Sequence, residues 1–167
     1  LLLQGATILD IGGQSTRPGS EFLKADEELK RVIPAIEIVH KHFPEAIISI
    51  DTFWASVAKE AVRAGASIIN DISAGSIDAS MYETVSKLSV PYVLMHMKGN
   101  PQNMQQSPVY ENLLTEVLDF FINQTAKLRA AGVNDIIIDP GFGFGKTVMQ
   151  NFLFFKKQKK KKMLGCP

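Results

Sequence analysis

Five short apolar runs in the sequence each end in a side chain that could bind a polar ligand. These terminal side chains are carboxylates or an imidazole, and in one run an amide precedes the carboxylate. The residues are Asp10, Asp51, Asn70, Asp71, His96 and Asp139. If the runs are parallel strands closed into a barrel, all of their carboxyl ends open onto one mouth, where polar groups converge on a common ligand.

The stretch DPGFGFGKT, residues 139–147, resembles a phosphate-binding loop but fails its spacing. A Walker A loop requires a glycine where this sequence has Pro140. The glycine spacing also differs from the dinucleotide-binding fingerprint. The glycines are Gly141, Gly143 and Gly145. We interpret them as residues that let the backbone leave the strand end sharply, which keeps Asp139 in the mouth and places Phe142 or Phe144 beside a flat ligand.

Two further loops follow apolar runs. The first, IGGQSTRPGS at residues 11–20, combines small residues with Arg17 and suits a mobile loop that closes over an anion or carboxylate. Pro18 would stiffen it behind the arginine. The second, MHMKGNPQNMQ at residues 95–105, is polar and rich in methionine. Methionines near a strand end are more often core residues than ligand contacts.

The apolar runs themselves lack strict alternation, which is typical of strands covered on both faces in a parallel sheet. Between them, helical spacing predicts helices over 25–42, 54–64, 79–88 and 110–131, the last ended by Gly132. Pro34 is expected to perturb the first of these helices. The alternating order predicts an α/β fold built from right-handed crossover units.

A (β/α)8 barrel and a doubly wound sheet both fit this order. The barrel is favoured because every strand ends in a polar side chain, whereas most such side chains in an open sheet would face no ligand. The chain has 167 residues and five units, fewer than the eight units and about 250 residues of a complete barrel. We therefore expect an incomplete barrel, whose open edges and inner face predict poor solubility for the chain alone.

Composition restricts the remaining possibilities. The single cysteine, Cys166, excludes a disulfide framework, and a reducing, cytoplasmic setting fits best. Residues 156–162 hold six lysines, so the net charge of +1 becomes +1 − 6 = −5 without them. No aromatic or Gly/Arg pattern interleaves these lysines, so we expect a solvated tail with no nucleic-acid or membrane partner. The apolar start is too short for a signal peptide or membrane helix, and we expect the chain to begin within a longer protein.

Four segments, taken together and in order, resemble dihydropteroate synthase of the bacterial, single-function type. They are DIGGQSTRPGS at 10–20, SIDTFWASVAKEAVRAGASIINDIS at 49–73, LMHMKGNPQNMQ at 94–105 and DPGFGFGK at 139–146. That family has a (β/α)8 barrel of the pterin-binding type. It joins 6-hydroxymethyl-7,8-dihydropterin diphosphate to 4-aminobenzoate and releases diphosphate, in folate biosynthesis. The resemblance implies that residues 1–147 are a partial barrel that covers about strands 2 to 6.

The resemblance also implies roles for individual residues. The aminopyrimidinone edge of a pterin needs a carboxylate and an amide as partners. The residues implied for pterin binding are Asp51, Asn70 and Asp139, with Ile72, Met95 and Phe144 packed against its faces. Asp51 and Asp139 are the catalytic candidates, because a nearby carboxylate stabilises the methylene cation that remains when diphosphate leaves.

Other residues are expected to act at the edge of this site. Thr16 is implied to contact the diphosphate region, and Arg17 and Pro18 to lie in the loop that closes over 4-aminobenzoate. Asp10 is expected to anchor that loop. Asp71 points to the opposite side of its strand from Asn70, so it is expected to hold a loop rather than the ligand.

The sequence departs from the family in three places. The family's first strand, with the asparagine associated with Mg2+ and diphosphate, has no counterpart here, and neither do its seventh and eighth strands. Mg2+ is therefore implied as a cofactor with no metal ligand in this chain, and a homodimer is implied for the parent protein. Residues 148–167 form an atypical, lysine-rich segment in place of the sixth barrel helix, with Gln150 where the family has histidine.

Three alternative functions stay open beside dihydropteroate synthase. A methyltetrahydrofolate-binding methyltransferase domain holds a pterin in a similar barrel, although STRPGS after Asp10 argues against it. A non-catalytic pterin-binding fragment is the second, and a P-loop NTPase is the least favoured. The isolated chain is expected to be inactive.

Overall fold

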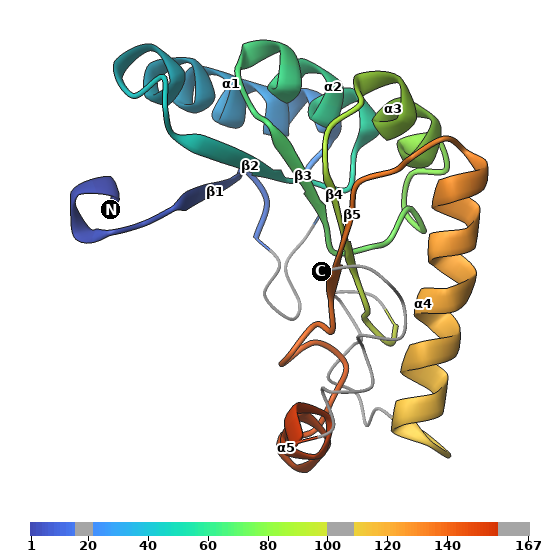
Figure 1. Cartoon of the computed structure of the whole chain (residues 1–167). Coiled ribbons are helices and arrows are strands. Elements are labelled where there is room, and N and C mark those ends of the chain that lie inside the picture. The colour runs from blue at the N-terminus through green and yellow to red at the C-terminus, as the bar shows by residue number, and fades with distance from the viewer. Residues whose placement is uncertain (16–21, 100–108, 157–167) are drawn as a thin grey trace.

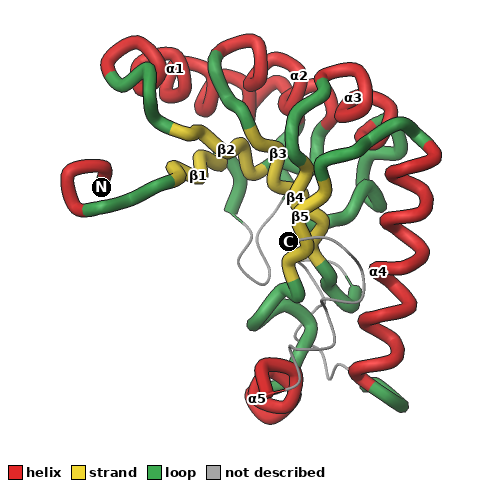
Figure 2. The backbone as a smooth tube through the Cα atoms, in the orientation of Figure 1, coloured by secondary structure: helices red, strands yellow, loops and turns green. Residues whose placement is uncertain are grey.

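One parallel sheet organises the computed structural model, which describes residues 1–15, 22–99 and 109–156. Its five strands lie side by side in the order of the sequence. They are β1 (Ile8–Gly12), β2 (Ile47–Asp51), β3 (Ile68–Asp71), β4 (Tyr92–Met95) and β5 (Ile136–Asp139). Figure 2 shows that the sheet curves rather than lying flat. The predicted α/β fold of parallel strands is confirmed.

Helices follow the strands in strict alternation. After the short 3-10 helix η1 (Leu2–Gln4), they are α1 (Ala25–His42), α2 (Ala55–Ala64), α3 (Met81–Leu88), α4 (Leu113–Ala130) and α5 (Val148–Lys156). Figure 1 shows α1, α2 and α3 side by side over one face of the sheet, with α4 beside β5 and α5 beyond the end of that strand. Within the described part of the chain, no helix covers the opposite face.

The helix boundaries follow from local chemistry. Helix α1 has the predicted bounds and runs through Pro34, which is exposed. Helix α4 begins three residues later than predicted because the Asn112 side chain accepts a hydrogen bond from the Thr115 amide at 3.2 Å and caps it. Beyond its other end, Gly132 has a φ of 95°, which confirms the predicted glycine cap.

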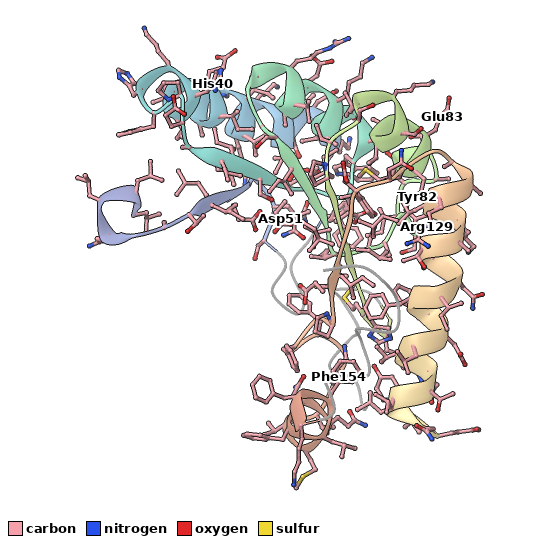
Figure 3. All side chains as sticks on the ribbon, viewed as in Figure 1. His40, Asp51, Tyr82, Glu83, Arg129 and Phe154 are labelled. Carbon is pink, nitrogen blue, oxygen red and sulfur yellow. The ribbon has the colours of Figure 1, made fainter. Side chains whose placement is uncertain are left out.

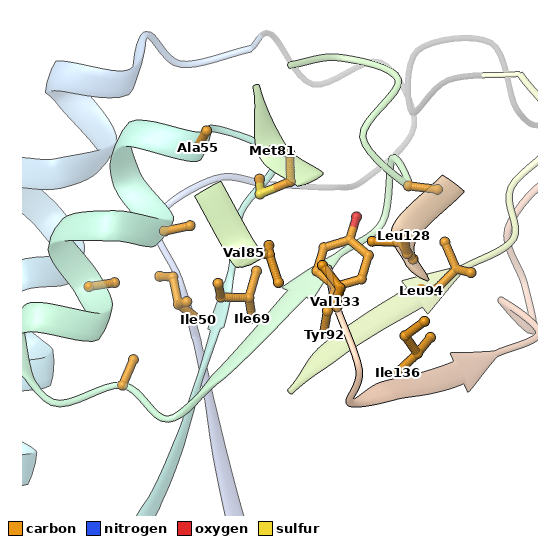
Figure 4. Close-up of a cluster of buried hydrophobic side chains, with 14 of the residues drawn as sticks. Ile50, Ala55, Ile69, Met81, Val85, Tyr92, Leu94, Leu128, Val133 and Ile136 are labelled. Carbon is orange, nitrogen blue, oxygen red and sulfur yellow. The ribbon is translucent and has the colours of Figure 1, made fainter. Parts of the chain in front are cut away.

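The main core lies between the sheet and helices α1–α4. Strand residues that face the helices, among them Ile50, Ile69 and Leu94, are fully buried against helix residues such as Met81 and Val85 (Figure 4). The opposite face differs, because Ile8 and Ile47 are 48% and 40% exposed there. The exposure of this inner face agrees with the prediction for an incomplete barrel, although the apolar runs by themselves predicted cover on both faces.

Among residues 1–15, 22–99 and 109–156, no helix combines the length and the apolar character needed to cross a bilayer.

A glycine is required at position 65, where α2 ends beside α1. Gly65 has a φ of 125°, and a Cβ there would lie 2.6 Å from Cγ of His40 on α1. We predict that Gly65→Ala lowers the free energy of unfolding by about 2–5 kcal/mol, because backbone strain and overpacking add.

The matched control is Gly5→Ala. Gly5 has a φ of 94°, but an added Cβ would meet nothing within 4 Å. This variant should cost only the backbone strain, about 1–2 kcal/mol. Urea denaturation of both variants checks the comparison, and equal losses would contradict the proposed packing of α2 on α1.

Candidate functional site

Strand register places three of the predicted site residues on one face of the sheet. Asp51 of β2 pairs with Asn70 of β3. Asn70 in turn pairs with Val93, and Val93 with Ile137 of β5. Residues in register on parallel strands point to the same face, and so does Asp139, two residues beyond Ile137. All three side chains therefore project from the face without helices, with Asp139 roughly 10 Å across the sheet from Asn70.

A hydrogen bond joins this set to β1. The Asn70 Nδ2 group donates to Oδ2 of Asp10 at 3.1 Å. Asp10 was expected to anchor the loop after β1, but its side-chain hydrogen bond within the described residues goes to Asn70. The contact fixes the orientation of the Asn70 amide, because the bonded nitrogen points toward β1 and the Oδ1 atom points away from it.

Asp51 carries the most perturbed carboxyl of the set. Burial, together with the smaller effect of the negative charges of Asp10, Glu28 and Asp71, raises its pKa to about 7. Figure 3 labels Asp51 at the carboxyl end of β2. Near neutral pH this side chain is present in both protonation states. Sequence reasoning missed this shift, because the shift depends on burial in the folded chain and on charges from three separate segments.

The side chain of Asp71, the neighbour of Asn70 in β3, projects from the face of the sheet that the helices cover. It is fully buried, and it accepts hydrogen bonds from the amides of Ser73 at 2.7 Å and Gly75 at 2.8 Å. The Tyr92 hydroxyl donates to it at 2.7 Å. Burial raises the pKa of Asp71, although these hydrogen bonds act in the opposite direction. The expectation that Asp71 holds a loop is confirmed, and that loop presents Ile72.

An apolar cluster lies beside the polar groups at the same end of the sheet. Ile72 and Met95 are buried together with Phe53, and Phe144 packs against them. The structure thus brings together the three residues that were predicted to pack against a flat ligand. Phe53 was missed, although its position two residues beyond Asp51 was a usable signal for the same face.

The glycine-rich loop after β5 is held by its own lysine. Lys146 is 3% exposed, and its ammonium donates to three backbone carbonyls at 3.1 Å each. These carbonyls belong to His96, Gly141 and Phe144. An ammonium bound in this way supports the loop instead of facing a phosphate, which agrees with the failed Walker A spacing.

The glycines of this loop adopt the backbone expected of them. Gly141, Gly143 and Gly145 have φ values of 64°, 83° and 59°. The Gly141 amide donates to Oδ1 of Asp139 at 2.8 Å. Of the two phenylalanines considered beside a ligand, Phe144 joins the apolar cluster, whereas Phe142 is 39% exposed and pairs with rings of α5.

Several expectations fall on residues whose placement is not described. Thr16, Arg17 and Pro18 lie outside the described residues, as does most of the lysine-rich run. Within residues 1–15, 22–99 and 109–156, no group of three or more His, Cys, Asp or Glu side chains could hold a metal ion. The donor set needed for Mg2+, several oxygens around one point, is therefore not assembled by the residues described.

Comparisons with known proteins agree on one family. A family model described as pterin binding enzyme matches residues 1–167. The dihydropteroate synthase of Escherichia coli is 44% identical over 150 residues, which are 89% of this chain and 52% of that protein. A folic acid synthesis protein of Pneumocystis carinii is 46% identical over 167 residues, but these are only 22% of its length. The chain thus spans about half of the bacterial relative and less of the fungal one.

Solved structures give the same result for the fold. The Yersinia pestis dihydropteroate synthase, determined as a sulfonamide drug complex, superposes with a TM-score of 0.95 at 40% identity. The match covers 99% of this chain and 60% of that one. The enzyme of Xanthomonas albilineans, determined with 4-aminobenzoic acid, gives a TM-score of 0.91 at 39% identity, over 99% and 59% of the two chains. The curved sheet therefore corresponds to part of a (β/α)8 barrel.

The raised pKa of Asp51 predicts a pH-dependent effect on stability. Its pKa is about 7 in the folded chain against an ordinary value of 3.8. The folded state therefore binds the proton more tightly, so the stabilisation present below pH 4 is lost as pH rises through 7. We predict that Asp51→Asn, which mimics the protonated form, stabilises the fold more at pH 8 than at pH 5, by a difference on the order of 1–3 kcal/mol.

Urea denaturation at both pH values checks this prediction. The control is Asp119→Asn on the exposed surface of α4, which should give the same small change at pH 5 and pH 8. An Asp51→Asn effect that does not change with pH would contradict the raised pKa.

Proposed function

This chain belongs to the pterin-binding enzyme family, and we propose that it is the central part of a dihydropteroate synthase. The complete protein would condense 6-hydroxymethyl-7,8-dihydropterin diphosphate with 4-aminobenzoate to give 7,8-dihydropteroate and diphosphate. The observation that carries the proposal is the arrangement of Asp51, Asn70 and Asp139 on one face of the sheet, beside an apolar cluster. A flat heterocycle with a polar edge is the kind of ligand that such a surface fits.

In this proposal the pterin edge binds to Asp139 and Asn70. Oδ1 of Asp139 accepts the Gly141 amide, which fixes the carboxylate and leaves Oδ2 for the ligand's adjacent N–H groups. Asn70 is oriented by Asp10, so its Oδ1 atom is available as an acceptor. Ile72, Met95 and Phe144 would pack against the ring faces, as their shared cluster suggests.

The chemical step proposed for this site is electrostatic. Departure of diphosphate leaves a positively charged pterin methylene group, which the Asp51 carboxylate stabilises until the arylamine attacks. The pKa of Asp51 is about 7, so only the ionised fraction can serve, and the rate should rise with pH through that value. The negative charge of Asp139, on the side of the site assigned to the pterin ring, contributes to the same stabilisation of the cation.

The second substrate is assigned to the loop after β1. Thr16 is proposed to contact the diphosphate region, and Arg17 and Pro18 to close over 4-aminobenzoate, the compound found with the Xanthomonas albilineans relative. The guanidinium of Arg17 supplies two parallel donors for a carboxylate. Mg2+ and a homodimeric complete protein are implied by the family, but no step is assigned to the metal because the described residues do not assemble its ligands.

Pterin binding tests the assignment of the polar residues. In a complete protein that contains this chain, Asn70→Ala and Asp139→Asn should each weaken the binding of a 6-hydroxymethylpterin ligand by about 100-fold or more, since each leaves ring groups unpaired. Isothermal titration calorimetry measures the loss. Asp135→Asn, at the other end of β5, is the matched control and should bind normally; normal binding by the Asn70 and Asp139 variants as well would refute the site.

Catalysis by the isolated chain tests its proposed place in a longer protein. These 167 residues should form dihydropteroate at least about 1,000-fold more slowly than a complete enzyme, because the family's remaining anion-binding residues have no counterpart in this sequence. The rate of diphosphate release measures this. Turnover comparable to that of a complete enzyme would overturn the prediction, whereas pterin binding without turnover agrees with it.

A further inference from the structure

One buried ammonium group links the end of β4 to the loop after β5. The Nζ atom of Lys146 donates to the carbonyls of His96, Gly141 and Phe144, each at 3.1 Å. An ammonium has three N–H donors, so each of these carbonyls receives one of them. Bonds from a charged donor are roughly twice as strong as bonds between neutral groups. The lysine, which is 3% exposed, is therefore a strong cross-link within the protein.

Each bonded carbonyl lies on, or next to, a residue that the proposed function assigns to the pterin. His96 directly follows Met95 in the chain. The Gly141 amide donates to Oδ1 of Asp139 at 2.8 Å. The third carbonyl belongs to Phe144, which packs in the same apolar cluster as Met95. The ammonium is thus linked, through one residue or one hydrogen bond, to three of the proposed ring contacts.

The loop after β5 also packs directly on the backbone that follows β4. A Cβ added at Gly141 would collide with the carbonyl oxygen of His96. One added at Gly145 would lie 2.6 Å from the carbonyl oxygen of Lys98. The two backbone segments are in contact at these points, so a change in the link at Lys146 moves both of them.

The imidazole of His96, one of the strand-end polar groups, supports this link from the helix side. His96 is 5% exposed, and its ring meets the ring of Phe120 on α4 edge-on, with centroids 4.9 Å apart. Burial, together with the smaller effect of the Lys146 charge, lowers the pKa of His96 to about 3. The imidazole is therefore neutral near pH 7, and the bond to the His96 carbonyl is made by a charged Lys146.

We propose that Lys146 is a positioning residue for the pterin ring. This inference rests on the proposed function, in which Met95, Asp139 and Phe144 bind that ring. The ammonium holds the end of β4 against the Phe144 segment, and it holds the turn that orients the Asp139 carboxylate. Lys146 acts through these groups and not on the ligand itself, because its donors are directed to backbone carbonyls.

Pterin affinity in a complete protein that contains this chain tests this role. Lys146→Met keeps a side chain of similar length and removes the charge and all three donors. The Kd for a 6-hydroxymethylpterin ligand, measured by calorimetry, should rise at least about 10-fold, because the charged hydrogen bonds that hold the ring contacts are lost. The KM for 4-aminobenzoate at saturating pterin diphosphate should stay within about 2-fold, since none of the three bonded carbonyls belongs to β1, β2 or the loops that follow them.

Lys98→Met is the matched control, because it removes an ammonium from the neighbouring segment. The Lys98 side chain is 41% exposed and donates to Oε2 of Glu116 at 2.7 Å. This variant should bind the pterin within about 2-fold of the original protein. An unchanged pterin Kd in Lys146→Met, an equal loss in both variants, or an equal rise in the constants for both substrates would overturn the proposal.

A second measurement uses the unsubstituted complete protein and decides the question if Lys146→Met does not fold. Ammonium protons on the surface exchange with water too quickly to be seen by NMR. A buried ammonium bonded to three carbonyls gives an observable nitrogen signal, assigned through the carbons of its own side chain. Addition of the pterin should shift the Lys146 signal and slow its exchange with water. A signal that does not respond to the pterin would overturn the proposal.

The Asp139→Asn variant separates the role of Lys146 from the proposed function. Loss of pterin binding in Asp139→Asn with normal binding in Lys146→Met would overturn only the role of Lys146. Weaker pterin binding in both variants, in a complete protein that forms no dihydropteroate, would contradict only the proposed function.

Discussion

The alternation of side chains along parallel strands is the constraint on which the site depends. Asn70 and Asp71 are adjacent in sequence, yet one projects from the open face while the other is fully buried under the helices. The register of β2 with β3 then places Asp51 beside Asn70, and the register of β4 with β5 brings Asp139 to the same face. A shift of one residue in any strand would exchange the two sets and bury the ligand-facing groups.

Electrostatics gives these carboxylates different roles. Asp71 is buried and accepts three hydrogen bonds, which offset part of the cost of burying the carboxyl group and make it a support for the turn. Asp51 faces the open side with acidic neighbours and a pKa of about 7. Lys146 stabilises the loop after β5 by binding carbonyls. A positively charged reaction centre would relieve the repulsion around Asp51, which is the physical link between fold and proposed chemistry.

Much of the fold could be predicted from the sequence, because buried strands and amphipathic helices leave strong local patterns. All five strands lie at the predicted apolar runs, although β1 continues past Asp10 to Gly12, and the positive φ of the glycines after Asp139 agrees with the predicted sharp exit of the backbone from the strand. The contacts that adjust the site could not be predicted in this way. The bond from Asn70 to Asp10 joins residues 60 positions apart, and the raised pKa of Asp51 depends first on burial in the folded chain and then on three distant charges.

The most direct test of this account is a crystal structure of the complete protein with a bound 6-hydroxymethylpterin ligand. The account predicts that the carboxylate of Asp139 and the amide of Asn70 bind the polar edge of one ring within hydrogen-bond distance, with Phe144 and Met95 against its faces and Asp51 beside the reactive methylene group. A ring bound elsewhere, or one that contacts none of these three polar side chains, would contradict it.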